Sequence, residues 1–314
     1  MSKAFFLLVA ICFAYTAAAC AQTLGVVNRS EGSFVFLDLK SEHIISVPNV
    51  GTFPHEVAVD EHGSFAYVPD YGGSKVAVIN LRKQKLEKHL NLPGFNKLHG
   101  IAISNNVVWV TAEEQRALVP LNGDFNPKPT LGYRSHMVTA VTGRKELYVA
   151  NIESGTVSIL HPDGSSPVVL MTGKGSEGID ASPDGRAVWA SNRAENTISI
   201  IETVHRVVSS TIPSHGDFPV KLVFRPDGKE VWVSNNRSGN VAIFESANKT
   251  LRHVLETGGR PLGIVFSNNS RYGYISRPGA EEILEIDIED NYRIVRRLKI
   301  PGSPDGMIWI GEQK

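Results

Sequence analysis

The feature that most constrains this chain is an internal repeat of about 42 residues. Each copy holds a short apolar segment, a turn of the Pro-Asp-Gly type, a second apolar segment with Tyr or Trp, and an exit rich in Asn. The clearest copies are residues 176–192, 219–235 and 54–70. Each is followed by two more segments of strand character before the next copy begins. Units of this kind bury their apolar faces only by stacking on one another.

Four short strands in a unit of this length are typical of a propeller blade. Six complete units begin at Pro54, Leu98, Ser135, Ser176, Pro219 and Pro261. The seventh is split, because residues 304–310 resemble a first strand while residues 24–28 and 33–39 resemble later ones. Joining the two ends closes the ring and removes exposed sheet edges. We therefore predict an all-β, seven-bladed β-propeller whose last blade is closed by N- and C-terminal strands.

The N-terminal segment differs from the repeats. Lys3 precedes an apolar stretch over residues 4–15, and small residues follow up to Ala21. This pattern predicts a secretory signal peptide over residues 1–21 and a single propeller domain over 22–314. The apolar stretch is too short for a transmembrane segment. The protein should be periplasmic or secreted, with a lipoprotein anchored at Cys20 as the alternative.

Composition excludes several classes of function. The 32 basic and 32 acidic residues balance, with no basic stripe and no zinc-finger spacing, so we expect no nucleic-acid partner. Both cysteines, Cys12 and Cys20, fall within or beside the predicted signal. Cleavage after Ala21 would leave no thiol nucleophile, iron–sulfur cluster or Cys-rich zinc site. We expect a monomer that binds a small-molecule substrate or ligand.

Chemically informative residues emerge when the repeats are superimposed on their first segments. One position per blade follows the residue that opens each copy, and it holds His55, His99, His136, Glu177, Val220, Leu262 and Asp305. The first strand of a blade is innermost, so these seven positions, here called the ring positions, should surround one mouth of the central channel. Asp305 could also belong to a turn, since residues 303–306 resemble residues 182–185, but the repeat spacing favours the ring.

Three imidazoles beside a carboxylate are a typical ligand set for a transition metal. We therefore predict that His55, His99, His136 and Glu177 bind a divalent transition metal, with Glu113 or Asp305 as general base. Two other interpretations remain open. The ring could hold an organic anion, or its polar groups could be side chains of a wet channel that bond neighbouring backbone.

Further candidate residues lie at the ends of the second segments, which should reach the same mouth. Arg29, Arg193 and Arg277 stand there, and they could bind a carboxylate or phosphate of a cofactor or substrate. A different repeat position is aromatic in six blades, which favours packing between blades over recognition. Its members are Tyr67, Trp109, Tyr148, Trp189, Trp232 and Tyr274.

Residues 65–70, 147–151 and 231–235 resemble the repeat of the YVTN family of bacterial propellers. That family is similar to the haem-binding propeller of cytochrome-type nitrite reductases and to lactonase and streptogramin-lyase propellers. The resemblance covers the whole predicted mature chain and implies the propeller fold. Its lactonase and lyase branches imply acids, His and a divalent metal at the central mouth. The absence of Cys-x-x-Cys-His excludes covalent c-type haem.

Two functions of different classes are consistent with this sequence. In the first, the chain is an exported metal-dependent hydrolase or lyase, acting on a small organic substrate in the manner of a lactonase or lyase. In the second, it is a non-catalytic periplasmic propeller that binds a cofactor or partner protein over the same mouth. The His pattern favours the enzyme.

Overall fold

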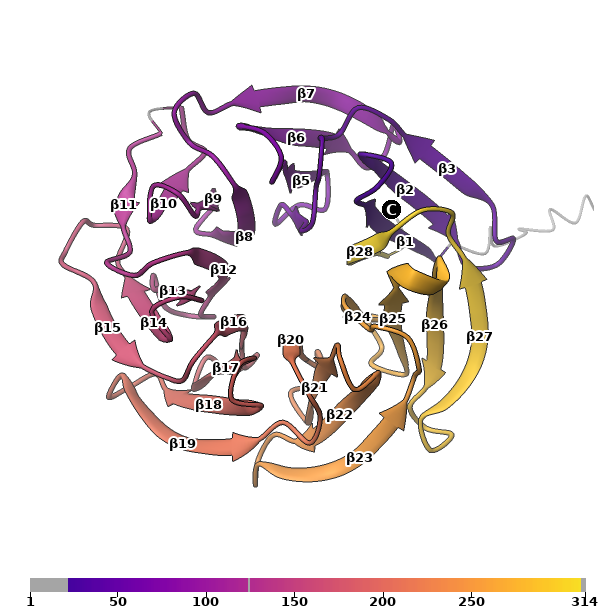
Figure 1. The fold of residues 1–314 in the computed structure, drawn as a ribbon. Helices are drawn as coiled ribbons and strands as arrows, with labels where there is room; N and C mark the ends of the chain where they lie inside the picture. Colours follow the sequence, from indigo (N-terminus) through magenta and orange to yellow (C-terminus); the bar gives the residue numbers. More distant parts are fainter. Residues whose placement is uncertain (1–21, 124, 312–314) are drawn as a thin grey trace, which may run out of the picture.

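The computed structural model describes residues 22–123 and 125–311, which form seven four-stranded antiparallel sheets arranged in a ring (Figure 1). The predicted signal peptide and Cys20 lie outside the described residues. The seven-bladed, all-β prediction is confirmed. Within the described part of the chain, no helix has the length and apolar character needed to cross a membrane.

The blades follow one another along the chain, each running from an inner to an outer strand. Blades 1 and 2 comprise β4 (Ala58–Val59), β5 (Phe65–Pro69), β6 (Lys75–Asn80), β7 (Lys85–Asn91), β8 (Leu98–Ser104), β9 (Val107–Ala112), β10 (Ala117–Pro120) and β11 (Lys128–Pro129). Blades 3 and 4 comprise β12 (Ser135–Ala140), β13 (Leu147–Asn151), β14 (Thr156–Leu160), β15 (Val168–Met171), β16 (Ser176–Ala181), β17 (Ala187–Asn192), β18 (Thr197–Glu202) and β19 (Val207–Pro213). Blades 5 and 6 comprise β20 (Pro219–Phe224), β21 (Glu230–Asn235), β22 (Asn240–Glu245), β23 (Thr250–Glu256), β24 (Ile264–Phe266), β25 (Tyr272–Arg277), the short 3₁₀ helix η1 (Pro278–Ala280), β26 (Glu282–Asp287) and β27 (Arg293–Lys299).

The two ends of the chain build the closing blade together. Its inner strand is β28 (Pro304–Ile310), followed by β1 (Thr23–Asn28), β2 (Ser33–Asp38) and β3 (Ile44–Val47). Thr23 lies opposite Ile310 across the β1–β28 ladder. Figure 1 shows β28, from the C-terminal end, beside β1 from the N-terminal end. The predicted split blade is confirmed.

Apolar side chains fill the spaces between neighbouring blades. Trp189 of β17 packs edge-on against Phe224 of the next blade, with 5.8 Å between ring centroids. Trp232 of β21 contacts Phe266 of blade 6 in the same way at 5.0 Å. Both indoles are almost fully buried. The repeated aromatic position therefore serves packing between blades, as its regularity predicted.

The inner strands carry an irregularity near the mouth where they begin. β8, β12, β16 and β20 start at the predicted residues, and each shows a register shift within its first four residues. The β28 ladder shifts in the same region. In blades 1 and 6 the inner strands start later than predicted, at Ala58 and Ile264. A bulge turns the backbone locally and redirects one side chain.

Asp180 on β16 ties three neighbouring inner strands together. Its carboxylate accepts a hydrogen bond from the backbone N–H of Phe224 on β20 at 2.9 Å and from the Thr139 hydroxyl on β12 at 3.4 Å. Burial raises its pKa to about 6, against the opposing effect of these hydrogen bonds. The folded protein thus holds this proton at a pH where the unfolded chain has lost it.

That difference predicts a pH effect on stability. Between about pH 4 and pH 6 the native state binds more protons at Asp180 than the unfolded state, so this group's contribution falls as pH rises. We expect the melting temperature of Asp180→Asn, relative to wild type, to increase across this range and then level off. Thermal melts of both proteins at a series of pH values would check this. The prediction would be contradicted if the melting temperature of Asp180→Asn, relative to wild type, stayed constant or fell between about pH 4 and pH 6.

Candidate functional site

All seven ring positions line one cavity of about 240 Å³ at the mouth where the inner strands begin. The ring positions of blades 2 to 5 and of the closing blade fall inside the register shifts described above. The bulges therefore account for the placement of these side chains around the cavity. Val220 and Leu262, with Phe53 and Met137, form the apolar part of the wall.

The backbone of the ring is held by very close approach of adjacent inner strands. A Cβ atom at Gly100 would lie 2.3 Å from the His136 carbonyl oxygen, so only glycine fits there. The Thr111 hydroxyl donates to that same carbonyl at 2.6 Å and accepts from the Gly100 N–H at 2.8 Å. These contacts fix the main chain of His136 from the neighbouring blade.

The three histidines are adjacent within the cavity. The rings of His99 and His136 stack with centroids 3.6 Å apart, and His55 lies 5.0 Å from His99. Tyr71 packs edge-on against both His55 and His99. Within residues 22–123 and 125–311, neither His55 Nε2 nor His99 Nδ1 has a hydrogen-bond partner, although both atoms are buried.

The environments of the two stacked rings push their pKa values apart. Burial, and next the proximity of His136, lowers the pKa of His99 well below its ordinary value. Burial also disfavours the charged form of His136, but hydrogen bonds to Glu113 and Glu177 outweigh it and raise that pKa. His99 is thus held neutral beside a His136 that is more readily protonated.

Glu113 lies behind His136 and organises one side of the site. It accepts hydrogen bonds from His136 Nδ1, from the Tyr71 hydroxyl at 3.1 Å and from Arg134 Nε at 3.3 Å. Burial alone would raise the pKa of Glu113, but the hydrogen bond from His136 and that ring's charge lower it. Glu177 lies 3.5 Å from His136 Nε2, so His136 sits between two carboxylates.

Asp305, the other residue predicted as a general base, contacts His55 in the same way that Glu113 contacts His136. Its Oδ2 atom lies 3.0 Å from His55 Nδ1 and 3.5 Å from Arg29 Nε. Both residues predicted as general bases thus contact an imidazole directly. Each carboxylate is therefore already paired with an imidazole, and neither faces the cavity as an unpaired base.

Two of the three predicted arginines reach the cavity. Arg29 and Arg193 line it, and Arg193 pairs with Glu177. The prediction for Arg277 is not supported, because this residue does not line the cavity. It lies opposite Glu282 across the β25–β26 ladder, and their side chains form an ion pair at 2.7 Å. The charge of Arg277 is therefore neutralised by Glu282 on the neighbouring strand of its own blade.

Several lining residues were missed by the sequence analysis. Beside Phe53 and Arg134, they are Glu56, Met137 and Lys221. The last three share one repeat position, directly after the ring position, where the other four blades have Gly. The departure from Gly at this repeat position is the sequence signal that could have identified these three residues. Lys221 reaches across the channel to Glu56, with 2.6 Å between Nζ and Oε2.

The predicted metal ligands line the same cavity, and their side-chain types suit a transition metal. Their arrangement does not fit one as it stands. Among the described residues, no three His, Cys, Asp or Glu side chains are grouped as a metal site requires. His136 directs both ring nitrogens at carboxylates, Glu113 and Glu177. The possible ligand atoms that remain are His55 Nε2 and His99 Nδ1, which are buried and have no hydrogen-bond partner in the described part of the chain.

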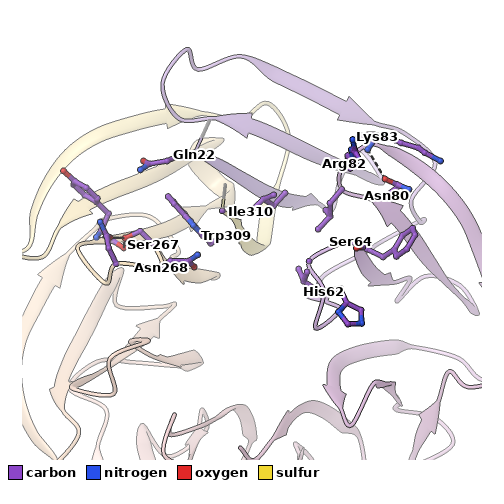
Figure 2. Close-up of a pocket in the computed structure, with 17 residues that line it drawn as sticks. Gln22, His62, Ser64, Asn80, Arg82, Lys83, Ser267, Asn268, Trp309 and Ile310 are labelled. Carbon is purple, nitrogen blue, oxygen red and sulfur yellow. Dashed lines mark hydrogen bonds between the residues drawn. The ribbon is translucent and has the colours of Figure 1, made fainter. Parts of the chain in front are cut away.

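A larger hollow, of about 1250 Å³, lies at the opposite end of the ring. Figure 2 shows Trp309 and Ile310 of β28, His62 of the β4–β5 loop and Asn268 of the β24–β25 loop around it. Its described lining contains one His and no Asp or Glu. We assign the functional site to the smaller cavity, because that is where titratable groups converge.

Comparisons with known proteins agree with this architecture. A family model described as a lactonase with a 7-bladed beta-propeller matches residues 163–258. The chain is a seven-bladed β-propeller. No curated protein matches the propeller's sequence.

Solved structures share the fold of this propeller at low sequence identity. A putative 6-phosphogluconolactonase from Bacteroides fragilis is 14% identical, with a TM-score of 0.75 over 94% of this chain and 99% of that one. A streptogramin B lyase is 15% identical, with a TM-score of 0.70 over 93% and 95%. The dihydro-heme d1 dehydrogenase NirN is 16% identical, with a TM-score of 0.64 over 92% and 75%.

Proposed function

We propose that this propeller is an exported enzyme that acts on a small organic substrate at its central mouth, by lactonase- or lyase-like chemistry. The observation that carries the proposal is the stacked His99–His136 pair in the cavity. Among the residues that the structure describes, the buried Nδ1 atom of His99 has no hydrogen-bond partner, whereas His136 is held between two carboxylates. Adjacent groups in such different environments are what a general base and a general acid require.

In this proposal each histidine has one role. His99 is the base, because its ring lines the cavity and is held neutral by burial, so it can accept a proton from an attacking water or from the substrate. His136 is the acid, because Glu113 and Glu177 support a second proton on its ring. For a lactone, water would add to the carbonyl carbon as His99 takes its proton. The ring C–O bond would break as the leaving oxygen takes the proton of His136 Nε2, in place of that atom's 3.5 Å contact with Glu177.

The two carboxylates first predicted as bases receive a different role. Glu113 and Asp305 each hold the Nδ1 atom of an imidazole, His136 and His55 respectively. A carboxylate in this position orients the ring and supports its charge. We therefore assign both as positioning residues, and Val220 and Leu262 as the surface for the apolar part of a substrate.

Similarity to proteins named lactonase and lyase supports an enzyme of this kind. The alternative is a non-catalytic periplasmic propeller that binds a cofactor or partner over the same mouth. A substrate screen separates the two. The purified protein would be offered γ- and δ-lactones and carbon–oxygen lyase substrates, with proton release and product formation followed by pH-stat and mass spectrometry. Turnover supports the enzyme, and none across the panel contradicts it.

Metal dependence is an alternative to the His99–His136 acid–base pair, because imidazoles bound to a metal could not also transfer these protons. It requires the side chains to leave the pairings described above, so that His55, His99, His136 and Glu177 hold a divalent ion that would supply a Lewis acid at the mouth. Elemental analysis of the purified protein checks it. About one equivalent of a transition metal, lost in a folded His55→Ala, His99→Ala, His136→Ala variant, would support it. No metal in either protein, even after reconstitution, would contradict it.

A further inference from the structure

We propose that Arg134 determines the specificity of this site, and that it selects substrates or ligands that carry a carboxylate or phosphate group. The inference rests on the proposed function for the location of the site. It adds the residue that recognises the anionic group, a role that the sequence predicted for Arg29, Arg193 and Arg277. Sequence reasoning assigned nothing to Arg134.

The first observation is an unusual backbone conformation shared by four consecutive blades. The residue two positions before the ring position has a positive φ in blades 2 to 5, at Lys97 (50°), Arg134 (58°), Gly175 (77°) and Phe218 (63°). Glycine adopts this region freely, whereas a residue with a Cβ is disfavoured there. Gly175 shows that glycine suits the position. Other residues of this ring also have a positive φ, so the conformation alone assigns no role, and the surroundings of each side chain decide.

The second observation separates Arg134 from its repeat equivalents. Arg134 lines the cavity, whereas Lys97 does not. Lys97 is about half exposed, and its Nζ lies 3.5 Å from Glu114 Oε1. The Phe218 ring packs between two guanidinium groups, those of Arg193 and Arg237. Of the three strained side chains, Arg134 is therefore the one that brings a charge to the cavity.

The third observation is that the guanidinium retains donors for a ligand. In the described part of the chain, the hydrogen bond of the Arg134 side chain runs from Nε to Glu113 at 3.3 Å. The Nη atoms of Arg29 and Arg193, by contrast, donate to Ser303 and Glu177. A guanidinium edge of this kind matches the paired oxygens of a carboxylate or phosphate.

The fixed charges of the site balance, so an anion is favoured by the Nη donors of Arg134 and not by a surplus of cations. The lining cations Arg29, Arg134, Arg193 and Lys221 form ion pairs with Asp305, Glu113, Glu177 and Glu56, respectively. At about 240 Å³ the cavity suits a small molecule. The anionic group would lie on Arg134, beside the stacked imidazoles, and the apolar part on Val220 and Leu262.

The test measures binding, so it does not depend on turnover. Isothermal titration calorimetry would compare succinate, its uncharged dimethyl ester and inorganic phosphate on wild type, Arg134→Gly and Lys97→Gly. Both variants remove the same backbone strain, so neither should lower the melting temperature much. We expect wild type and Lys97→Gly to bind an anion alike and not the ester. Arg134→Gly should bind that anion about tenfold or more weakly. Succinate against phosphate shows which anionic group is preferred.

Arg134→Gln is the second variant, because it keeps the backbone conformation and removes the charge. Failure of wild type to bind either anion, or equal binding by folded Arg134→Gly or Arg134→Gln, would overturn the inference. Anion binding that depends on Arg134 in a protein with no turnover would contradict the proposed enzyme and leave the inference standing. Turnover of neutral lactones with the same kcat/KM in wild type and Arg134→Gly would contradict the inference on Arg134 and support the proposed enzyme.

Discussion

Replacing His99 with alanine should lower kcat by about 100-fold or more, because the proposed general base is lost. The fold should survive this change. His99 contributes no hydrogen bond from its buried Nδ1 atom within the described residues, so truncation removes an unsatisfied polar group along with some packing. The melting temperature should therefore change far less than activity. Steady-state kinetics on any substrate found by the screen, with thermal melts of the same preparations, would check both.

His205→Ala provides the matched control. This histidine lies in the β18–β19 loop, outside the cavity. It is largely exposed and pairs with Glu202 at the end of β18. It should leave kcat and melting temperature unchanged. A folded His99→Ala protein with wild-type turnover would remove His99 from the mechanism. A protein that unfolds would instead assign His99 a structural role.

The repeat made the architecture and the seven ring positions predictable from the sequence. A fixed period places equivalent residues at equivalent sites, so His55, His99 and His136 could be superimposed without a structure. The closing blade followed from the same count, since residues 304–310 lacked the strands that residues 24–39 supply. Symmetry, rather than local propensity, carried these predictions.

What the repeat could not show was how side chains pair. Arg29 and Arg193 occupy one repeat position, and Arg277 stands at the position just before it, where Glu282 directly across the ladder pairs with it. Arg134 escaped notice because its repeat equivalents differ in kind and its backbone conformation is not readable from the residue type. Departures from the repeat, rather than the repeat itself, distinguish the site from the scaffold.

Removing the last strand should abolish cooperative folding. Deletion of residues 302–314 takes away β28, the inner strand of the closing blade, and exposes the edge of β1 to which it pairs. It also removes Ile308, which packs into the apolar core between the closing blade and blade 1. A ring depends on every interface, because an open end leaves two blade faces without a partner. Circular dichroism and differential scanning calorimetry should show no cooperative transition.

A circular permutant shows whether closure or mere chain length is responsible. Because Thr23 lies opposite Ile310, a short linker can join residues 22 and 311 in the manner of a hairpin. New ends can be opened at Gly164, in the exposed turn between β14 and β15. This permutant keeps all 28 strands, so it should melt cooperatively near the wild-type temperature. If the deletion also melts there, ring closure contributes little. If the permutant fails to fold, order along the chain matters more than the closed ring, since every blade and interface is present in it.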